Sequence, residues 1–223
     1  MRPKSATAAP AGKKPQHKIR PPLAHQVRII GGLWKRTPLP VPAAEGLRPT
    51  PDRVRETVFN WIAHLLTGSQ ALGNWQQLAC LDLFAGSGAL GFECASRGAA
   101  QVTMIESHTP AVRQLETTKL KLQASQVEIL RADALVAAQK LAAAGRRYGL
   151  IFLDPPYHKD WLPKMLPLCA ALLEQDGLLY LEAEQALEIG VASMPEWLSG
   201  WQLIRADHAG SVFYHLLQRK NTA

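Results

Sequence analysis

The sequence predicts an α/β fold with a mostly parallel, doubly wound β-sheet, and three observations lead to this prediction. Four short apolar runs alternate with stretches of helical spacing, which is typical of parallel strands joined by right-handed helical crossovers. These runs begin near Leu78, Val102, Val127 and Leu150. A glycine-rich turn follows the first run, and two prolines end the fourth. Ligands of such sheets bind at the carboxyl ends of the strands, so we expect a site where the first and fourth strands end.

The chain begins with a basic arm, residues 1–25, which is rich in alanine, proline and lysine and lacks apolar periodicity. This composition predicts disorder in the free protein. Nine Lys and Arg residues and no acidic residue precede Glu45, whereas the rest of the chain has sixteen basic and eighteen acidic residues. Most of the attraction for phosphate therefore lies near the N-terminus. The arm either becomes ordered on RNA or is a solvated tail or a transit peptide, although its prolines and scarce serines disfavour the last.

An N-terminal extension, residues 26–66, is predicted to begin with a basic hairpin over residues 28–41 that turns at Gly31-Gly32. Its basic and aromatic residues can follow an RNA backbone or stack on a base. They are Arg28, Trp34, Lys35 and Arg36. Trp34 can equally cover the hydrophobic core, which is the more frequent role of a lone tryptophan.

A helix is predicted to follow the hairpin and to end near Leu66, with Thr50 or Asp52 as its cap and Glu56 completing the capping arrangement. Several charged residues lie within about two turns of its start, so they either form an ion network or point towards the site. These residues are Arg48, Asp52, Arg53 and Glu56.

The catalytic domain is expected over residues 67–223, and its first strand, residues 80–84, leads into the glycine turn 85–91 (AGSGALG) and a helix that ends near Arg97. Gly86 and Gly88 allow a tight turn and close approach of a ligand to the backbone. Gly91 allows the helix to pack close to the sheet. A strand, a glycine turn and a helix in this order predict a nucleotide-like cofactor.

Two acidic residues follow the next two strands. Glu106 ends the strand 101–105 and lies twenty residues beyond Gly86, a distance at which an acid can accept hydrogen bonds from ribose hydroxyls. Asp133 follows the strand 127–130 and can accept from an adenine amine. For both residues the alternative is a helix cap.

The motif Asp154-Pro155-Pro156-Tyr157 directly follows the apolar run 148–153. Two prolines cannot continue a ladder or a helix, so the chain is rigid where the buried strand ends. The Asp154 carboxylate and a proline carbonyl can accept both hydrogens of an exocyclic amine, and the Tyr157 ring can stack on the base that carries it. An ordinary turn is the alternative interpretation.

The remaining sequence completes the sheet and adds no second kind of site. A fifth strand is predicted over 178–182, and strands near 201–205 and 211–217 should form an antiparallel hairpin. Cys80, Cys94 and Cys169 lack the spacing of metal ligands, so we expect no metal and reduced thiols in the cytoplasm. No apolar stretch is long enough to cross a membrane. No histidine pairs with a nucleophile, which argues against a hydrolase.

These motifs together resemble a known group of enzymes. Residues 82–88 (DLFAGSG) and 154–157 (DPPY) are similar to the S-adenosylmethionine-dependent amino-methyltransferases. Residues 27–35 (VRIIGGLWK) and 46–61 (GLRPTPDRVRETVFNW) closely resemble the start of the RsmD family, and the similarity continues to the end of the chain. That family methylates the N2 atom of a guanine in 16S rRNA.

The resemblance implies a Rossmann-like class I methyltransferase fold with a seven-stranded sheet and S-adenosylmethionine as cofactor. It implies that Asp154, Pro155 and Tyr157 are the catalytic residues. The implied cofactor contacts are Asp82, Phe84, Ala85, Gly86, Ser87, Gly88, Glu106, Asp133 and Ala134. The implied RNA contacts are Arg28, Trp34, Lys35, Arg36, Arg48 and Arg53. The implied partner is 16S rRNA in an assembled or assembling small subunit, and we expect a cytoplasmic monomer.

Other functions share parts of this pattern. An amino-methyltransferase that acts on DNA adenine or cytosine, or on a protein glutamine, would use the same two motifs, although a protein substrate needs no basic arm. A dinucleotide oxidoreductase would explain the glycines and Glu106 but leaves residues 154–157 without a role. A non-catalytic RNA-binding module would need neither motif.

Overall fold

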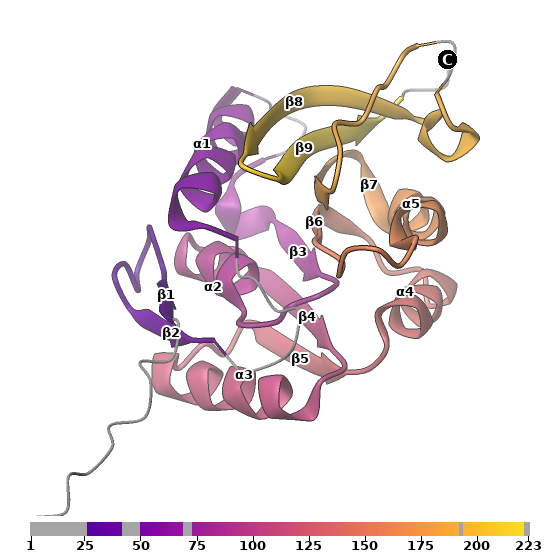
Figure 1. The fold of residues 1–223 in the computed structure, drawn as a ribbon. Coiled ribbons are helices and arrows are strands. Elements are labelled where there is room, and N and C mark those ends of the chain that lie inside the picture. The colour runs from indigo at the N-terminus through magenta and orange to yellow at the C-terminus, as the bar shows by residue number, and fades with distance from the viewer. Residues whose placement is uncertain (1–25, 42–49, 69–72, 192–193, 221–223) are drawn as a thin grey trace, which may run out of the picture.

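The computed structural model describes residues 26–41, 50–68, 73–191 and 194–220, and a seven-stranded sheet forms their centre (Figure 1). The strand order is β5-β4-β3-β6-β7-β9-β8. The strands are β3 (Ala79–Asp82), β4 (Gln101–Glu106), β5 (Val127–Arg131), β6 (Tyr148–Leu153), β7 (Leu173–Ala183), β8 (Trp201–Ala209) and β9 (Val212–Arg219). The strands from β5 to β7 are parallel, and β9 pairs antiparallel with β7 and β8. The predicted doubly wound sheet with a C-terminal antiparallel hairpin is confirmed.

Helices cover both faces of this sheet and make three layers (Figure 1). They are α1 (Asp52–Gly68), α2 (Ala89–Ser96), α3 (Thr109–Leu122), α4 (Ala134–Ala143) and α5 (Trp161–Leu172), with short 3₁₀ turns η1 (Trp75–Gln77) and η2 (Glu196–Leu198). Neighbouring residues of a strand point to opposite faces. Accordingly, Leu150 and Phe152 of β6 pack with α1, α2 and α3, whereas Ile151 and Leu153 pack with α4 and α5. Every residue of β6 is buried, as expected for a central parallel strand.

The N-terminal extension shares the hydrophobic core of the sheet. The ring of Phe59 in α1 lies 5.8 Å from the ring of Phe152 in β6, and Trp61 lies 5.6 Å from Tyr214 in β9. Pairs of aromatic rings at these separations add to the stabilisation that burial provides. Helix α1 is therefore held over the sheet where β6, β7 and β9 lie side by side. The division of the chain at residue 66 stays a prediction.

The predicted hairpin is present, but its turn is wider than expected. Strands β1 (Gln26–Arg28) and β2 (Pro38–Pro40) pair antiparallel, and residues 29–37 connect them. The backbone N–H groups of Ile30 and Gly31 donate to the carboxylate of Glu93 in α2 instead of to the opposite strand. Because these donors are used by another element, the ladder ends before Gly31-Gly32.

Candidate active site

The carboxyl ends of five parallel strands bring acidic side chains to one edge of the sheet. The residues at or just after the ends of β3, β4, β5, β6 and β7 are Asp82, Glu106, Asp133, Asp154 and Glu182. Strands β3 and β6 are neighbours, and the order of the strands reverses between them. This is the edge at which the sequence predicts a ligand-binding site. Glu182 was not among the predicted site residues.

The glycine turn between β3 and α2 has the geometry for which glycine is required. Gly86 and Gly88 have φ angles of 52° and 78°, in the left-handed region. A Cβ atom on Gly88 would also lie 2.6 Å from the side chains of Phe92 and Leu115. A Cβ atom on Gly91 would lie 2.4 Å from the side chain of Met104 in β4. The predicted tight turn and close approach of α2 to the sheet are confirmed.

Asp82 connects β3 to α2 from a buried position. Its Oδ2 accepts a hydrogen bond of 3.1 Å from the backbone N–H of Gly91, and only 2% of the residue is exposed. Burial raises the pKa of Asp82 to about 7; the Glu106 carboxylate contributes to this rise, and the N–H groups of Gly91 and Phe84 oppose it. The carboxyl group therefore holds the start of α2 against the end of β3.

Glu106 and Asp133 both bind backbone N–H groups of the loops around them. Glu106 accepts from Gly86 through Oε2 at 2.8 Å and from His108 through Oε1 at 2.7 Å. Asp133 accepts from Val136 at 3.1 Å and caps α4, so the capping interpretation is confirmed for this residue. An ionised carboxylate has about four acceptor positions, so capping leaves room for ligand hydroxyl or amine groups.

An aromatic pair connects the end of β3 to the start of α5. Phe84 follows β3, and its ring meets the ring of Trp161, the first residue of α5, at 5.2 Å in an edge-to-face arrangement. The Trp161 Nε1 atom is buried and has no hydrogen-bond partner among the described residues. Trp161 follows the acceptor motif by four residues and was not among the predicted site residues.

The acceptor motif leaves β6 in a loop that the end of β7 holds in place. Asp154 and Tyr157 are partly buried, and Pro155 is buried. His158 and Asp160 have φ angles of 60° and 48°, which non-glycine residues adopt only where the surroundings enforce them. Glu184 accepts from both the backbone N–H and the Nδ1 atom of His158, with the Nδ1 contact at 2.8 Å. These contacts fix the loop that carries the Tyr157 ring.

Asp154 is part of a buried polar cluster that joins β6, β7 and the segment before α1. The Thr50 hydroxyl donates to Oε1 of Glu182 at 2.6 Å and lies 3.4 Å from Oδ2 of Asp154. The Tyr180 hydroxyl also donates to Oε1 of Glu182, at 2.7 Å. Burial, followed by the charges of Glu182 and Asp82, raises the pKa of Asp154 well above its usual value. Thr50, predicted as a possible helix cap, thus binds an acidic residue of the sheet instead.

Arg55 organises the start of α1 from a fully buried position and was also missed from the sequence. It donates to the carbonyl oxygens of Thr50 at 3.3 Å and Arg28 at 2.9 Å, and to the Asp52 carboxylate at 2.6 Å. Asp52 also pairs with the exposed side chain of Arg28 at 2.8 Å. An ion network therefore exists here, in which Asp52 pairs with both Arg28 and the buried Arg55. Arg53 and Glu56 are exposed, and Arg48 lies outside the described residues.

The hairpin presents its predicted RNA contacts on the side of α2. Lys35 and Arg36 are exposed, whereas Trp34 is half-buried and packs against the core, as its structural interpretation predicted. The hairpin is held through its main chain, since Glu93 accepts from Ile30 at 2.6 Å and from Gly31 at 2.9 Å. The structure thus separates the predicted residues into an acceptor group at the sheet edge and a basic group beside α2.

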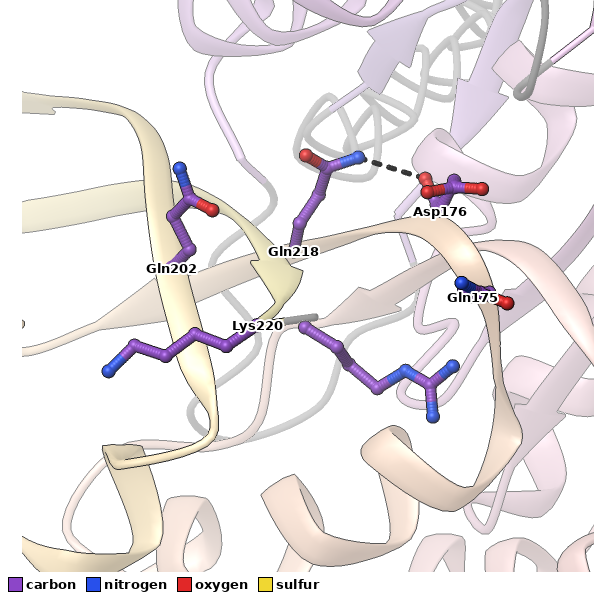
Figure 2. A pocket seen from close by; sticks show the side chains of 6 residues that line it. Gln175, Asp176, Gln202, Gln218 and Lys220 are labelled. Carbon is purple, nitrogen blue, oxygen red and sulfur yellow. Dashed lines mark hydrogen bonds between the residues drawn. The ribbon is translucent and has the colours of Figure 1, made fainter. Parts of the chain in front are cut away.

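A polar hollow lies at the opposite edge of the sheet, where β7 begins and β9 ends. It has a volume of about 380 Å³ and is lined by Gln175, Asp176, Gln202, Gln218, Arg219 and Lys220. Figure 2 shows the Gln218 amide directed at the backbone carbonyl of Asp176, to which it donates at 2.9 Å. The hollow contains none of the predicted site residues, and the length of the sheet separates it from the acceptor motif.

Cys80, Cys94 and Cys169 are buried free thiols. Within residues 26–41, 50–68, 73–191 and 194–220, no group of three or more His, Cys, Asp or Glu residues is arranged to hold a metal ion. In the same part of the chain, no helix combines the length and the apolar character that a membrane crossing requires.

Comparison with known proteins agrees with this geometry. The family model described as conserved hypothetical protein 95 matches residues 27–218. The ribosomal RNA small subunit methyltransferase D of Escherichia coli K12 is 39% identical, with 93% of this chain and 96% of that protein covered. The protein of the same name from Haemophilus influenzae is 37% identical, with 90% of this chain and 98% of that protein covered.

Solved structures show the same fold. A structure from Escherichia coli has a TM-score of 0.71 and 36% identity, covering 89% of this chain and all of that one. One from Thermus thermophilus has a TM-score of 0.69 and 27% identity, covering 86% of this chain and 99% of that one. A precorrin methyltransferase from Geobacter metallireducens, at 16% identity and a TM-score of 0.57, shares the fold alone and covers 81% of this chain and 94% of that one. The family match spans both the glycine turn and the acceptor motif, and the chain therefore belongs to this family of methyltransferases, as its resemblance to the RsmD family predicted.

Proposed function

We propose that this protein transfers a methyl group from S-adenosylmethionine to the exocyclic N2 atom of a guanine in small-subunit 16S rRNA. The observation that carries the proposal is the position of residues 154–157 directly after β6, beside the glycine turn that follows β3. A cofactor on the turn and an amine on the acceptor motif would meet across one edge of the sheet. The curated relatives named ribosomal RNA small subunit methyltransferase D support the class of substrate.

The residues of the turn fit a nucleotide-like cofactor. Side chains at Gly86 and Gly88 would be strained by the positive φ angles, so the backbone stays open to close approach. Glu106 orients the turn and offers carboxylate oxygens to ribose hydroxyls. We assign cofactor binding to Asp82, Phe84, Ala85, Gly86, Ser87, Gly88, Glu106, Asp133 and Ala134. When bound, S-adenosylmethionine supplies an electrophilic methyl group on a sulfonium ion.

Asp154 and Pro155 would hold the acceptor amine. The lone pair of guanine N2 is delocalised into the ring, so the nitrogen is a poor nucleophile until it becomes pyramidal. Hydrogen bonds from its two N–H groups to the Asp154 carboxyl and the Pro155 carbonyl would direct the lone pair at the methyl group. Alignment of two reactants can contribute roughly 7–11 kcal/mol. Positioning is therefore the main contribution that these residues make to the rate.

Tyr157 would provide the surface on which the target base stacks. The base must leave its own stack to reach the sheet edge, at a cost of a few kcal/mol, and stacking on an aromatic ring offsets part of that cost. The fixed loop keeps the Tyr157 ring in one place, since Glu184 holds His158 next to it. A flipped guanine would then lie between Tyr157 and the carboxyl group of Asp154.

The basic extension would bind the RNA backbone. Exposed Lys35 and Arg36 on the hairpin and Arg53 on α1 can neutralise phosphates, and Arg28 joins them at the hairpin base. Arg48 and Trp34 complete the assigned contacts, and residues 1–25 add further positive charge. The expected substrate is an assembled or assembling small subunit in the cytoplasm, with the enzyme acting as a monomer.

The direct test is methylation with labelled S-adenosylmethionine of small ribosomal subunits that lack the modification, of naked rRNA and of duplex DNA. Digestion and mass spectrometry then identify the labelled nucleoside. We expect N2-methylguanosine from the subunits. The variant Asp154→Ala should bind the cofactor and transfer no methyl group. Label that appears only in DNA or in protein would overturn the substrate, and loss of cofactor binding in the variant would overturn the role of Asp154.

A further inference from the structure

Glu182 lies beside Asp154 because of the register of two parallel strands. Phe152 pairs with Tyr180 and Leu153 pairs with Leu181, so Asp154 and the next residue of β7 follow side by side. Alternation along the strands directs Phe152 and Tyr180 to the face that α1 covers, and Glu182, two residues beyond Tyr180, shares that face. Glu182 is only 3% exposed. A second carboxyl group is thus buried directly beside the acceptor residue.

The two carboxyl groups lie side by side. The Thr50 hydroxyl contacts both, at 2.6 Å from Oε1 of Glu182 and 3.4 Å from Oδ2 of Asp154. Ionised carboxylates only accept hydrogen bonds, so two neighbouring carboxyl groups can bond to each other only when one of them carries a proton. Two like charges at this separation in a buried site would also repel each other strongly. The pair therefore rests with one negative charge.

The two hydroxyl donors place that charge on Glu182. Thr50 and Tyr180 both donate to Oε1 of Glu182, at 2.6 Å and 2.7 Å. Hydrogen bonds to a charged carboxylate are about twice as strong as neutral ones. The shared proton accordingly rests on Asp154, whose second oxygen can still accept a hydrogen bond from an amine.

We propose that Glu182 is a positioning residue for methyl transfer, which shares one proton with Asp154 and receives that proton when Asp154 takes another from the methylated amine. This inference rests on the proposed function and deepens it. The bond between sulfur and the methyl carbon breaks as the bond between nitrogen and that carbon forms. One N–H proton then passes to the free oxygen of Asp154, the shared proton passes to Glu182, and water removes one proton from the neutral pair.

The surroundings of the pair determine its pH range. Asp82 on β3 faces Asp154, Tyr180 and Thr50 face Glu182, and Tyr214 of β9 stands opposite Glu182 in the register. Burial raises the pKa of Glu182, against the hydrogen bonds from Thr50, Tyr180 and Asp154. Below the first apparent pKa of the pair, both carboxyl groups are protonated and cannot accept the proton of the methylated amine. Above the second apparent pKa, the pair loses the shared proton and the two carboxylates repel each other.

The test is the pH dependence of single-turnover methyl transfer to small subunits. The wild type should give a bell-shaped profile that reports the two apparent pKa values of the pair. In Glu182→Gln the alkaline fall should disappear, since one titrating group remains, and the rate at neutral pH should fall about tenfold. Affinity for S-adenosylmethionine should stay within about twofold. Glu174→Gln is the matched control, because Glu174 is an exposed residue at the other end of β7.

A second variant keeps the test decisive if the first variant does not fold. Thr50→Val removes one hydroxyl donor from the charged carboxylate without changing the charge of the pair. The single charge becomes less stable, so the acid limb should move to higher pH, while Thr50→Ser should keep the wild-type profile. A profile of wild-type shape in either Glu182→Gln or Thr50→Val, merely scaled down, would leave Glu182 a structural residue and overturn the proposal. If the wild type methylates another amine, the same profiles are measured on that acceptor, so the two proposals fail separately.

Discussion

The two edges of the sheet carry very different side chains. At the carboxyl edge, Asp82 and Glu182 are buried, and Asp154 joins them with a raised pKa. At the opposite edge, Gln175, Gln202 and Lys220 are exposed around an open polar hollow, and the Gln218 amide satisfies a backbone carbonyl (Figure 2). Burying an acid away from water disfavours its charged form, whereas exposed amides and amines keep their hydration.

The buried acids favour the carboxyl edge as the site of the proposed chemistry, because burying them is energetically costly. A protein keeps buried, mutually repelling acids only where the rest of the structure holds them, and such groups cluster at functional sites. A concave surface alone is a weaker indicator, because the hollow at the opposite edge is wide and polar but none of the residues that line it is fully buried. The comparison predicts that substitutions at the carboxyl edge reduce activity without reducing stability, and that substitutions at the opposite edge change neither.

The largest effect is expected for Asp154→Asn. Methyl transfer should fall at least about 100-fold, because the amide cannot take the proton from the methylated amine. The melting temperature should not fall, since the asparagine amide can donate to the Glu182 carboxylate in place of the shared proton. Thermal unfolding and single-turnover rates measured on one preparation test this. Parallel losses of activity and stability would remove the distinction between the edges.

A pH-dependent effect on stability is expected for Asp82→Asn. The folded-state pKa of Asp82, about 7, lies above its ordinary value of 3.8, so the folded protein binds more protons between these limits. The free energy of unfolding should therefore fall as pH rises from about 4 to 7, by up to about 4 kcal/mol from this residue. The asparagine oxygen can still accept from Gly91, so the variant should lose this dependence.

Denaturant unfolding of the wild type and Asp82→Asn at pH 4, 6 and 8 measures the effect. The difference between the two proteins should grow with pH in favour of the variant. Because the other buried acids are common to both proteins, their contributions cancel in the difference. A difference that is constant over this range would mean that Asp82 stays ionised at all three values.

A smaller loss of stability, confined to the hairpin, is expected for Glu93→Gln. This variant tests whether the hairpin is held independently of the carboxyl edge of the sheet. In the variant, the amide nitrogen would face the backbone N–H of Ile30 or Gly31, so two donors would meet without an acceptor. Arg97 would also lose its carboxylate partner. Together these changes should lower the free energy of unfolding by about 2–3 kcal/mol. RNA affinity should fall while affinity for S-adenosylmethionine is kept. Filter binding and calorimetry measure the two affinities. Equal losses of both would mean that α2 itself is displaced.

The smallest effects are expected at the opposite edge. Gln202→Ala and Lys220→Ala should change the free energy of unfolding by no more than about 0.5 kcal/mol, since both side chains are exposed. Methyl transfer to small subunits should also be unchanged. A clear loss of transfer in either variant would show that the hollow of Figure 2 takes part in substrate binding.

Local sequence patterns sufficed for the fold and for most of the acceptor edge. The glycine turn, Glu106 and residues 154–157 each follow an apolar run, and the carboxyl ends of parallel strands must meet at one edge. Several boundaries were too short: β7 begins at Leu173 rather than 178, and β8 continues to Ala209 rather than 205. Both strands are longer than predicted because their ends are polar. Backbone hydrogen bonds continue where the side chains are exposed, so the apolar run ends before the strand does.

The missed residues depend on contacts that no local pattern contains. Thr50 and Glu182 are 132 residues apart, and only the closure of α1 over β7 brings them together. In the sequence, Arg55 is one of several basic residues near the start of the helix. It can be buried because its guanidinium group donates to the carbonyl oxygens of Thr50 and Arg28, which the sequence does not reveal. One signal for Glu182 was present, since it is an acid at the end of an otherwise apolar strand, 178–181. That pattern alone also fits an exposed strand end.

The way in which the hairpin is attached bears on how its substrate preference can evolve. Its contacts with α2 use the main-chain groups of Ile30, Gly31, Leu33 and Trp34, which bind Glu93 and Ser96. Gly32 is fixed in identity, because its φ angle is 74° and a Cβ atom would lie 1.9 Å from the Ser96 carbonyl oxygen. The side chains of Leu33, Lys35 and Arg36 can therefore be exchanged without releasing the hairpin. Under the proposed function, related enzymes can acquire a new RNA preference here by a few substitutions, while the catalytic framework is inherited unchanged.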